Sequence, residues 1–178
     1  MKTYIALFRG INVGGKNILP MTELKALLEN LGLQHVKTYI QSGNVVFQSN
    51  EKNASWLSSK ISAEIKKSHG FEPKVLLLDI EEMEKAIGSN PFPEAESEPK
   101  TLHLNFLASV PETPDLKALK SLKKENERFE LKGNVFYLHA PDGVGRSKLA
   151  ANAERLLGVA MTSRNWRTVS KIMAMAKE

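Results

Sequence analysis

The stretch TYIALFRGINVGGKN, residues 3–17, joins an apolar segment to a loop rich in glycine and asparagine. Residues 3–9 follow an alternating side-chain pattern and carry β-prone side chains, which predicts a strand. After it, Gly10, Gly15 and Lys16 approach the spacing of a phosphate-binding P-loop, in which Ser or Thr follows the lysine at the start of a helix. Here Asn17 follows. The first question is whether this loop binds a nucleotide or serves another site.

Pro20 argues against a P-loop. Proline belongs in the first turn of a helix, so the next helix is expected to begin near residue 20 and to leave Lys16 in a loop. A P-loop instead places its lysine at the helix N-terminus, beside the phosphates. Asn17 also lacks the hydroxyl group that would hold Mg²⁺. The glycines and polar side chains therefore need another explanation.

The first half of the chain follows a regular order of elements. Leucines share one face of a helix that opens at Pro20 and stops at Gly32. A hairpin around Ser42-Gly43-Asn44, a second helix and a further strand follow, at residues 35–49, 52–69 and 74–79. The order is β-α-β-β-α-β, which is the ferredoxin-like split unit.

The second half repeats much of this pattern. The sequence predicts a strand, a helix, a hairpin around Gly133-Asn134 and two further helices, at residues 101–108, 115–124, 128–139, 146–157 and from about 164. Both hairpins contain the letters GNV, which favours a duplication, although common turn chemistry would also explain them. We interpret the second half as a degenerate repeat that ends in a helix instead of a strand.

These patterns predict an α+β protein with two subdomains. The first is expected at residues 1–80 and the second, with basic C-terminal helices, at residues 101–178. Residues 81–100 are expected to form a helix and an acidic, proline-bearing linker.

Composition narrows the function classes. The 178 residues are 42% hydrophobic and 25% charged, as in an ordinary soluble protein, and no segment has the length of a membrane span. The chain contains no cysteine, which excludes thiolate chemistry and suits the cytoplasm. Its net charge of +5 arises within residues 146–178, so nucleic acid or another anion is a candidate partner, and an ordinary solvated helix face is the alternative.

The topology predicts a polar site at one edge of the first sheet. In a β-α-β-β unit the first two strands are parallel, so the loop after the first strand and the turn after the second should be neighbours. Cationic and amide groups with free backbone N–H groups suit an anionic or polar ligand. Alternatively, the glycines shape two turns that the polar groups cap. The candidate residues are Arg9, Gly10, Asn12, Gly14, Gly15, Lys16, Asn17, Gln41, Ser42, Gly43 and Asn44.

Four blocks of the sequence are distinctive. They are RGINVGGKN at residues 9–17, TYIQSGNVVF at residues 38–47, GRSKL at residues 145–149 and a TxRNWxT segment at residues 162–168. On these blocks the chain resembles the bacterial family of proteins of unknown function DUF1697. The resemblance implies an α+β fold with ferredoxin-like subdomains, and it implies no particular activity.

Two further motifs are candidate anion sites. Arg146, Ser147 and Lys148 follow a glycine-rich loop at the start of a helix, which suits phosphate or sulfate, or is an ordinary helix cap with charges in solvent. Arg164 and Asn165 lie in the predicted first turn of the last helix, with Thr162 or Ser163 as its cap, and could contact nucleic acid or a ligand.

The sequence assigns no catalytic residues and no cofactor. The four histidines have no metal-ligand spacing, although His103 and His139 lie on predicted strands that could be neighbours. The first hypothesis is a cytoplasmic protein that binds a phosphorylated or other anionic ligand. The alternatives are an enzyme acting on a phosphorylated small molecule, with Lys16 or Arg146 stabilising charge, a nucleic-acid-binding module, or a scaffold in which the glycines are structural.

Overall fold

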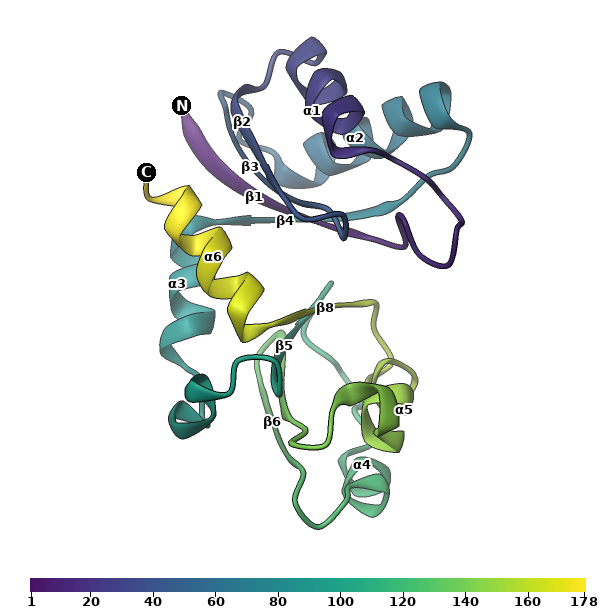
Figure 1. Cartoon of the computed structure of the whole chain (residues 1–178), viewed down its shortest axis with the longest axis vertical. Coiled ribbons are helices and arrows are strands. Elements are labelled where there is room, and N and C mark those ends of the chain that lie inside the picture. The colour runs from purple at the N-terminus through teal and green to yellow at the C-terminus, as the bar shows by residue number, and fades with distance from the viewer. The chain divides into compact units, whose positions relative to one another are not determined.

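The computed structural model describes every residue from 1 to 178 and contains two compact α+β units (Figure 1). Unit 1 comprises Met1–Glu84 together with Lys171–Glu178, and unit 2 comprises Lys85–Ser170. Each unit has one four-stranded antiparallel sheet. The last eight residues, which we expected in the second subdomain, thus group with unit 1.

Unit 1 has the predicted β-α-β-β-α-β order. Its elements are β1 (Lys2–Arg9), α1 (Met21–Asn30), β2 (Gln34–Tyr39), β3 (Asn44–Ser49), α2 (Ala54–His69) and β4 (Lys74–Asp79). The order across the sheet is β2-β3-β1-β4, so β1 is a central strand that pairs antiparallel with β3 and with β4. Strands β1 and β2 are therefore parallel, as the sequence predicted.

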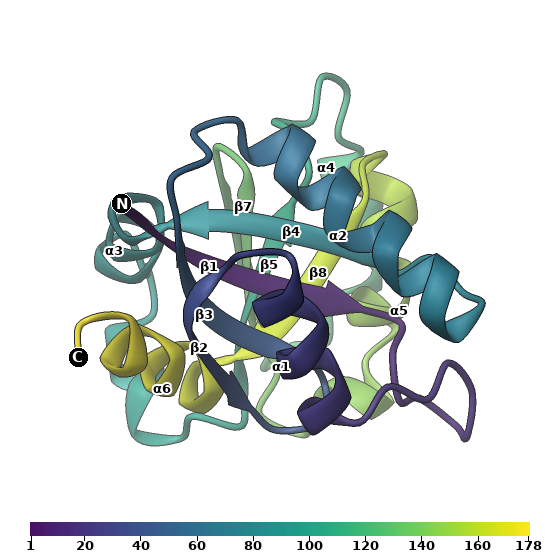
Figure 2. The ribbon, with the colours of Figure 1, turned by 90° about the horizontal axis from the view of Figure 1, so that it is seen from above.

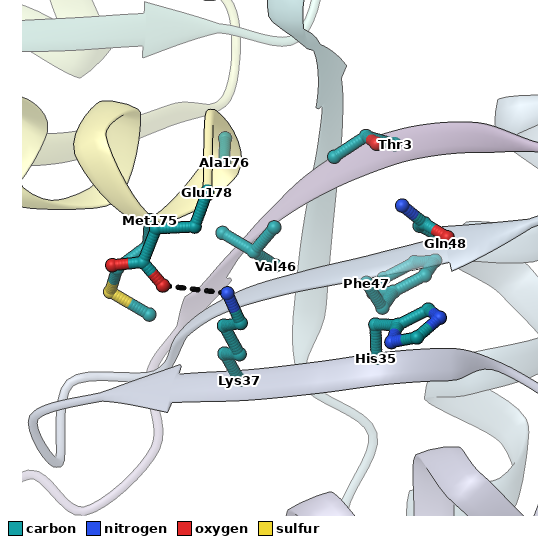
Figure 3. A pocket seen from close by; sticks show the side chains of 9 residues that line it. All are labelled: Thr3, His35, Lys37, Val46, Phe47, Gln48, Met175, Ala176 and Glu178. Carbon is teal, nitrogen blue, oxygen red and sulfur yellow. Dashed lines mark hydrogen bonds and ion pairs between the residues drawn. The ribbon is translucent and has the colours of Figure 1, made fainter.

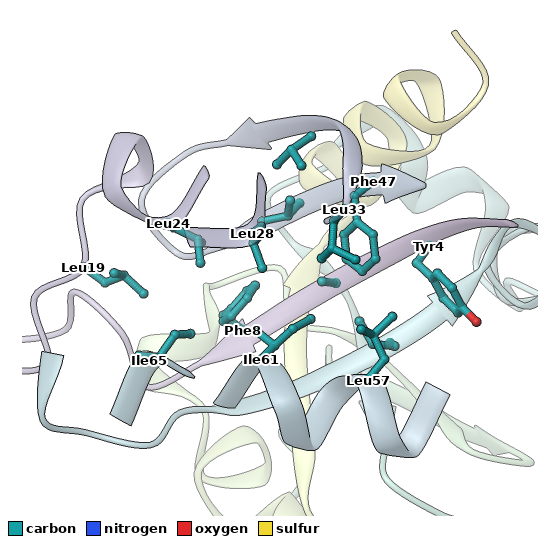
Figure 4. Close-up of a cluster of buried hydrophobic side chains, with 14 of the residues drawn as sticks. Tyr4, Phe8, Leu19, Leu24, Leu28, Leu33, Phe47, Leu57, Ile61 and Ile65 are labelled. Carbon is teal, nitrogen blue, oxygen red and sulfur yellow. The ribbon is translucent and has the colours of Figure 1, made fainter. Parts of the chain in front are cut away.

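The core of unit 1 lies between the sheet and its two helices. Alternate residues of β1, among them Tyr4 and Phe8, point toward α1 and α2 and are almost completely buried (Figure 4). Leu24 and Leu28 from α1 and Ile61 from α2 pack against them. The four-residue spacing of these aliphatic side chains explains why both helices form: each buries one apolar stripe.

Local signals set the ends of these helices. Pro20 immediately precedes the first helical residue of α1, and Gly32 follows its end with φ +87°. The side chain of Asn53 accepts a hydrogen bond from the Trp56 amide and caps α2, and Gly70 ends α2 in the left-handed conformation. The helix start that we predicted from Pro20 is confirmed.

Unit 2 repeats the arrangement of unit 1. Its main elements are β5 (Leu102–Leu107), α4 (Leu116–Leu122), β6 (Arg128–Lys132), β7 (Val135–His139), α5 (Lys148–Leu157) and β8 (Met161–Asn165). The order across its sheet is β6-β7-β5-β8, which matches the order in unit 1 element for element. Between β4 and β5 lie α3 (Ile80–Gly88) and a short 3₁₀ turn (Pro93–Ser97), and α6 (Trp166–Ala176) follows β8.

The prediction that the second copy ends in a helix without a fourth strand is wrong. Residues 161–165 form β8, which pairs antiparallel with β5 in a register that joins Phe106 to Thr162. Helix α6 begins only at Trp166, and Asn165 caps it by accepting a hydrogen bond from the Thr168 amide at 2.9 Å. Thr162 and Ser163 therefore belong to a strand and do not cap the helix. Pairing with β5 overrides the local capping signal.

The shared GNV letters are displaced by one residue in the structure. The Phe8 amide donates to the Gly43 carbonyl at 2.9 Å, and the equivalent bond in unit 2 joins Leu107 to Asn134 at 2.8 Å. Gly43 thus corresponds to Asn134, not to Gly133. The two units share their sheet order, but the common letters reflect turn chemistry and not equivalent positions.

The last helix of the chain buries the apolar face that its sequence predicts. Trp166, Val169, Ile172 and Met173 are all buried. No helix combines the length and the apolar character needed to cross a membrane.

We predict that Gly43→Ala destabilises the protein by at least about 2 kcal/mol. The added Cβ atom would overpack the core, and alanine would have to adopt the positive φ of this position. That Cβ would lie 2.6 Å from Ile11 Cδ1 and 2.7 Å from Phe8 Cβ, at φ +88°. Urea unfolding measures the effect. Gly15→Ala is the control, since its φ is +72° with open space around it, and should cost only about 1 kcal/mol. Equal losses in the two variants would contradict the packing argument.

Candidate functional site

The candidate site is the edge of the unit 1 sheet where β1 ends, together with the loop from Gly10 to Leu19 and the turn from Ile40 to Gly43, here called the loop edge. The loop projects away from the sheet (Figure 2). One side chain ties the two segments together: Asn12 Nδ2 donates to the Leu19 carbonyl at 2.9 Å and to the Gln41 carbonyl at 2.8 Å. The two segments that we expected to be neighbours are therefore in direct contact.

The asparagines of the loop edge stabilise the backbone. Asn12 Oδ1 also accepts a bond from the Leu19 amide at 2.7 Å, and Asn17 Nδ2 donates to the Gly10 carbonyl at 2.9 Å. Both residues have positive φ, which asparagine tolerates better than most side chains. The buried Asn44 donates to the Tyr39 carbonyl at 3.0 Å. These three side chains hold the loops in shape and are positioning residues of the site.

The glycines have two different roles. Gly43 is packed against Phe8 and Ile11, where no side chain fits. Gly14 and Gly15 instead form the tip of a small hairpin in which the Lys16 amide donates to the Val13 carbonyl at 3.0 Å. Their positive φ values suit the two-residue turn that joins such a hairpin. The amides of Gly14 and Gly15 donate no hydrogen bond within the chain, and both residues are exposed.

Besides Asn17, the exposed polar side chains of the loop edge are Lys16, Gln41 and Ser42. The ammonium group of Lys16 forms no ion pair within the chain. Ser42 Oγ accepts a hydrogen bond from Asn44 Nδ2 at 3.0 Å. A cation and an amide are thus exposed at an edge whose backbone is held in place by hydrogen-bonded asparagines.

A further cation lies at this edge that the sequence argument missed. Strand β4 runs antiparallel to β1, so its first residue, Lys74, lies directly opposite Arg9. Lys74 is exposed and forms no ion pair. The signal was available in principle, since antiparallel pairing of the first and last strands of a β-α-β-β-α-β unit brings these two ends together.

The other two predicted motifs lie in unit 2. Ser147 is buried and caps α5, accepting a hydrogen bond from the Ala150 amide at 3.0 Å, while Arg146 and Lys148 are exposed on either side of it. The interpretation of this motif as an ordinary helix cap therefore explains the role of Ser147. Arg164 is partly buried on β8, where its Nη1 donates to the Ser163 carbonyl at 2.9 Å and burial lowers its pKa to about 10. Asn165 is engaged as the cap of α6.

The histidine pair that we considered does not form. In the register of β5 with β7, His103 lies opposite Leu138 and His139 lies opposite Leu102, so the two histidines point to opposite faces of the sheet. No three His, Asp or Glu side chains gather as they would around a metal ion. His139 Nδ1 instead accepts a hydrogen bond from Arg128 Nη2 at 3.0 Å.

Unit 1 also contains a small pocket beside the end of α6 (Figure 3). Its volume is about 190 Å³, which is below the usual range for a drug-sized ligand. Lys37 Nζ and Glu178 Oε2 form an ion pair across it at 2.6 Å. The lysine is therefore already neutralised, and the loop edge is the better candidate for an anion.

Comparison with known proteins bears on the fold more than on the site. The sequence profile described as "Protein of unknown function (DUF1697)" matches residues 1–137. The chain belongs to this family. A conserved bacterial protein from Streptococcus pneumoniae is 30% identical, with 98% of each chain covered and a TM-score of 0.68. No curated protein matches. The Streptococcus pneumoniae protein shares the α+β fold of this chain, and neither description names a ligand.

Asn12→Ala should destabilise the protein by about 2–3 kcal/mol, because it removes three hydrogen bonds to the two loop segments. Lys16→Ala should change stability by no more than about 0.5 kcal/mol, because the lysine is on the surface and unpaired. Urea unfolding of both variants measures the difference. A large loss in Lys16→Ala would mean that the lysine is part of the fold.

The pH dependence of stability should reflect the two strand histidines. Burial lowers the pKa of His103, and burial together with the Arg128 guanidinium lowers the pKa of His139. The unfolded chain, with a histidine pKa of about 6.5, therefore binds protons that the folded protein does not, and the free energy of unfolding falls as the pH drops below about 6.5. Urea unfolding between pH 5 and 8 should show a flatter profile in His139→Asn. The exposed His35→Asn is the control, and an unchanged profile in both would contradict this assignment.

Proposed function

We propose that the loop edge of unit 1 binds an anionic ligand, with a phosphorylated small molecule in the cytoplasm as the first candidate. The observation that carries the proposal is the register of β1 with β4, which places Lys74 at the end of the sheet where the loop that bears Lys16 begins. Both lysines are exposed and form no ion pair within the chain. An anion bound at this edge would neutralise their charge, and its binding would stabilise the fold.

The hairpin of the loop edge supplies the remaining groups. Lys16 is an exposed ammonium group without an ion pair, and it follows the two glycine amides that donate no hydrogen bond. Backbone N–H groups and ammonium groups are the usual donors to phosphate oxygens. Asn12 and Asn17 hold this hairpin in place, so its backbone would need little ordering to bind.

Nucleic acid is less well supported at the C-terminal end of the chain. Trp166 is buried, so it is no platform for base stacking, and Arg164 is partly buried on its strand. Arg167 and Lys171 remain exposed on α6. They could attract a polyanion, and a strong salt dependence of binding would then result.

The test is a thermal-shift screen with inorganic phosphate, pyrophosphate, sugar phosphates, nucleotides and short RNA, at low and moderate salt. A ligand at one hundred times its Kd should add about 2.7 kcal/mol to the free energy of unfolding. Lys16→Ala and Lys74→Ala should each weaken the effect at least about tenfold in Kd, since each removes a charge-assisted hydrogen bond of about 1.5–3 kcal/mol.

Lys25→Ala is the matched control, because this lysine is exposed on α1 and is not part of the loop edge. Stabilisation by RNA alone, fading with salt and lost in Arg167→Ala, would favour nucleic acid over the small anion. If none of these compounds stabilises the protein, the anion site is overturned. The scaffold hypothesis, in which the glycines only shape the turns, would then be favoured.

A further inference from the structure

Three large aliphatic side chains are exposed on the loop edge. Val13, Ile18 and Ile40 expose 65%, 55% and 49% of their surface, although most aliphatic side chains of unit 1 are buried. From their position we propose that they form an apolar subsite beside the anion site, so that the ligand is an amphipathic organic anion that carries an aliphatic group next to its charge. This inference rests on the proposed function and names the class of its ligand.

The side chain of Asn12 links the two segments that carry the three residues. Its Nδ2 atom donates to the carbonyls of Leu19 and Gln41, which are the direct neighbours of Ile18 and Ile40 in the chain. Val13 is itself the neighbour of Asn12. One amide group thus ties together the segments that would contribute the three aliphatic side chains to one subsite.

The hairpin also joins the apolar subsite to the cation. Val13 and Lys16 form an antiparallel bridge, with the Lys16 amide donating to the Val13 carbonyl at 3.0 Å. Residues paired in this way project their side chains to the same face. An aliphatic group in contact with Val13 therefore lies beside the Lys16 ammonium group. This is the arrangement that a phosphate or carboxylate with an attached carbon chain requires.

Ile40 holds an unfavourable backbone conformation. Its φ is +50°, a left-handed value that is a clear outlier for a β-branched residue and that asparagine or glycine would adopt far more readily. Half of its side chain is exposed, so burial in the core only partly offsets this strain. A role in binding would explain why an isoleucine occupies this position, which its packing does not explain.

The chemistry of the patch decides between occupants. None of the three side chains is aromatic, and stacking on nucleic-acid bases or anchoring at a membrane interface uses aromatic side chains. A second copy of the chain would bring the cations Lys16 and Lys74 toward their own equivalents, which repel. A small organic anion satisfies both the charge and the apolar surface.

Isothermal titration with inorganic phosphate and with ethyl, n-butyl and n-hexyl phosphate tests the inference. Each methylene group that becomes buried should lower Kd by up to about fourfold. Val13→Ser and Ile40→Asn should abolish this dependence on chain length and leave the affinity for inorganic phosphate unchanged. Lys16→Ala should weaken every member of the series. Val110→Ser is the matched control, since Val110 is 61% exposed in unit 2.

Ile40→Asn gives a second readout. Because it relieves the positive φ, it should raise the melting temperature while it removes the dependence on chain length. If Ile40 had only a structural role, the dependence of Kd on chain length would remain in Ile40→Asn.

The outcomes separate the two proposals. Binding of inorganic phosphate with no gain from longer chains would overturn the apolar subsite and leave the anion site standing. Absence of binding by the whole series would overturn both. Equal binding of n-hexanol and n-hexyl phosphate would show partition onto an apolar surface without a role for charge. Binding only to vesicles that contain anionic lipid would assign the patch to a membrane surface and overturn the small-ligand proposal.

Discussion

Antiparallel pairing of β1 with both of its neighbours is the constraint on which unit 1 depends. This strand is central, and its alternate residues form the floor of the core under α1 and α2. The same pairing decides the surface at its end. It places Arg9 opposite Lys74 of β4 and brings the turn after β2 against the loop after β1. The core and the candidate site are thus two consequences of one register.

The polar groups of the loop edge fall into two sets, those that hold the backbone in place and those that are exposed. Amide side chains within a polar loop are ambiguous, because they can serve a ligand or the backbone equally well. Here Asn12, Asn17 and Asn44 donate to backbone carbonyls, while Gly14, Gly15 and Lys16 are exposed. A loop held by its own hydrogen bonds presents its remaining donors with little entropy to lose on binding. This division of roles resembles the general design of binding loops on rigid scaffolds.

The two units show how far one architecture can diverge at its edges. Their sheets have the same strand order, and the same backbone bond closes the edge in both, from Phe8 to Gly43 and from Leu107 to Asn134. Unit 2 nevertheless has a two-residue turn between β6 and β7, where unit 1 has four residues between β2 and β3. The longer turn in unit 1 carries Gln41, Ser42 and the strained Ile40. The difference explains why Gln41 and Ser42 have no counterparts in the shorter turn of unit 2.

The sequence alone determined the order of elements in unit 1, the helix boundary at Pro20, and the closeness of the two loops in unit 1. These follow from local rules, because hydrophobic periodicity, proline geometry and the parallel crossover each act over short distances along the chain. Only the tertiary structure decided that residues 161–165 form a strand and that the strand histidines face opposite ways. Each of these depends on the register between strands far apart in the sequence, and local propensity carries no information about that register.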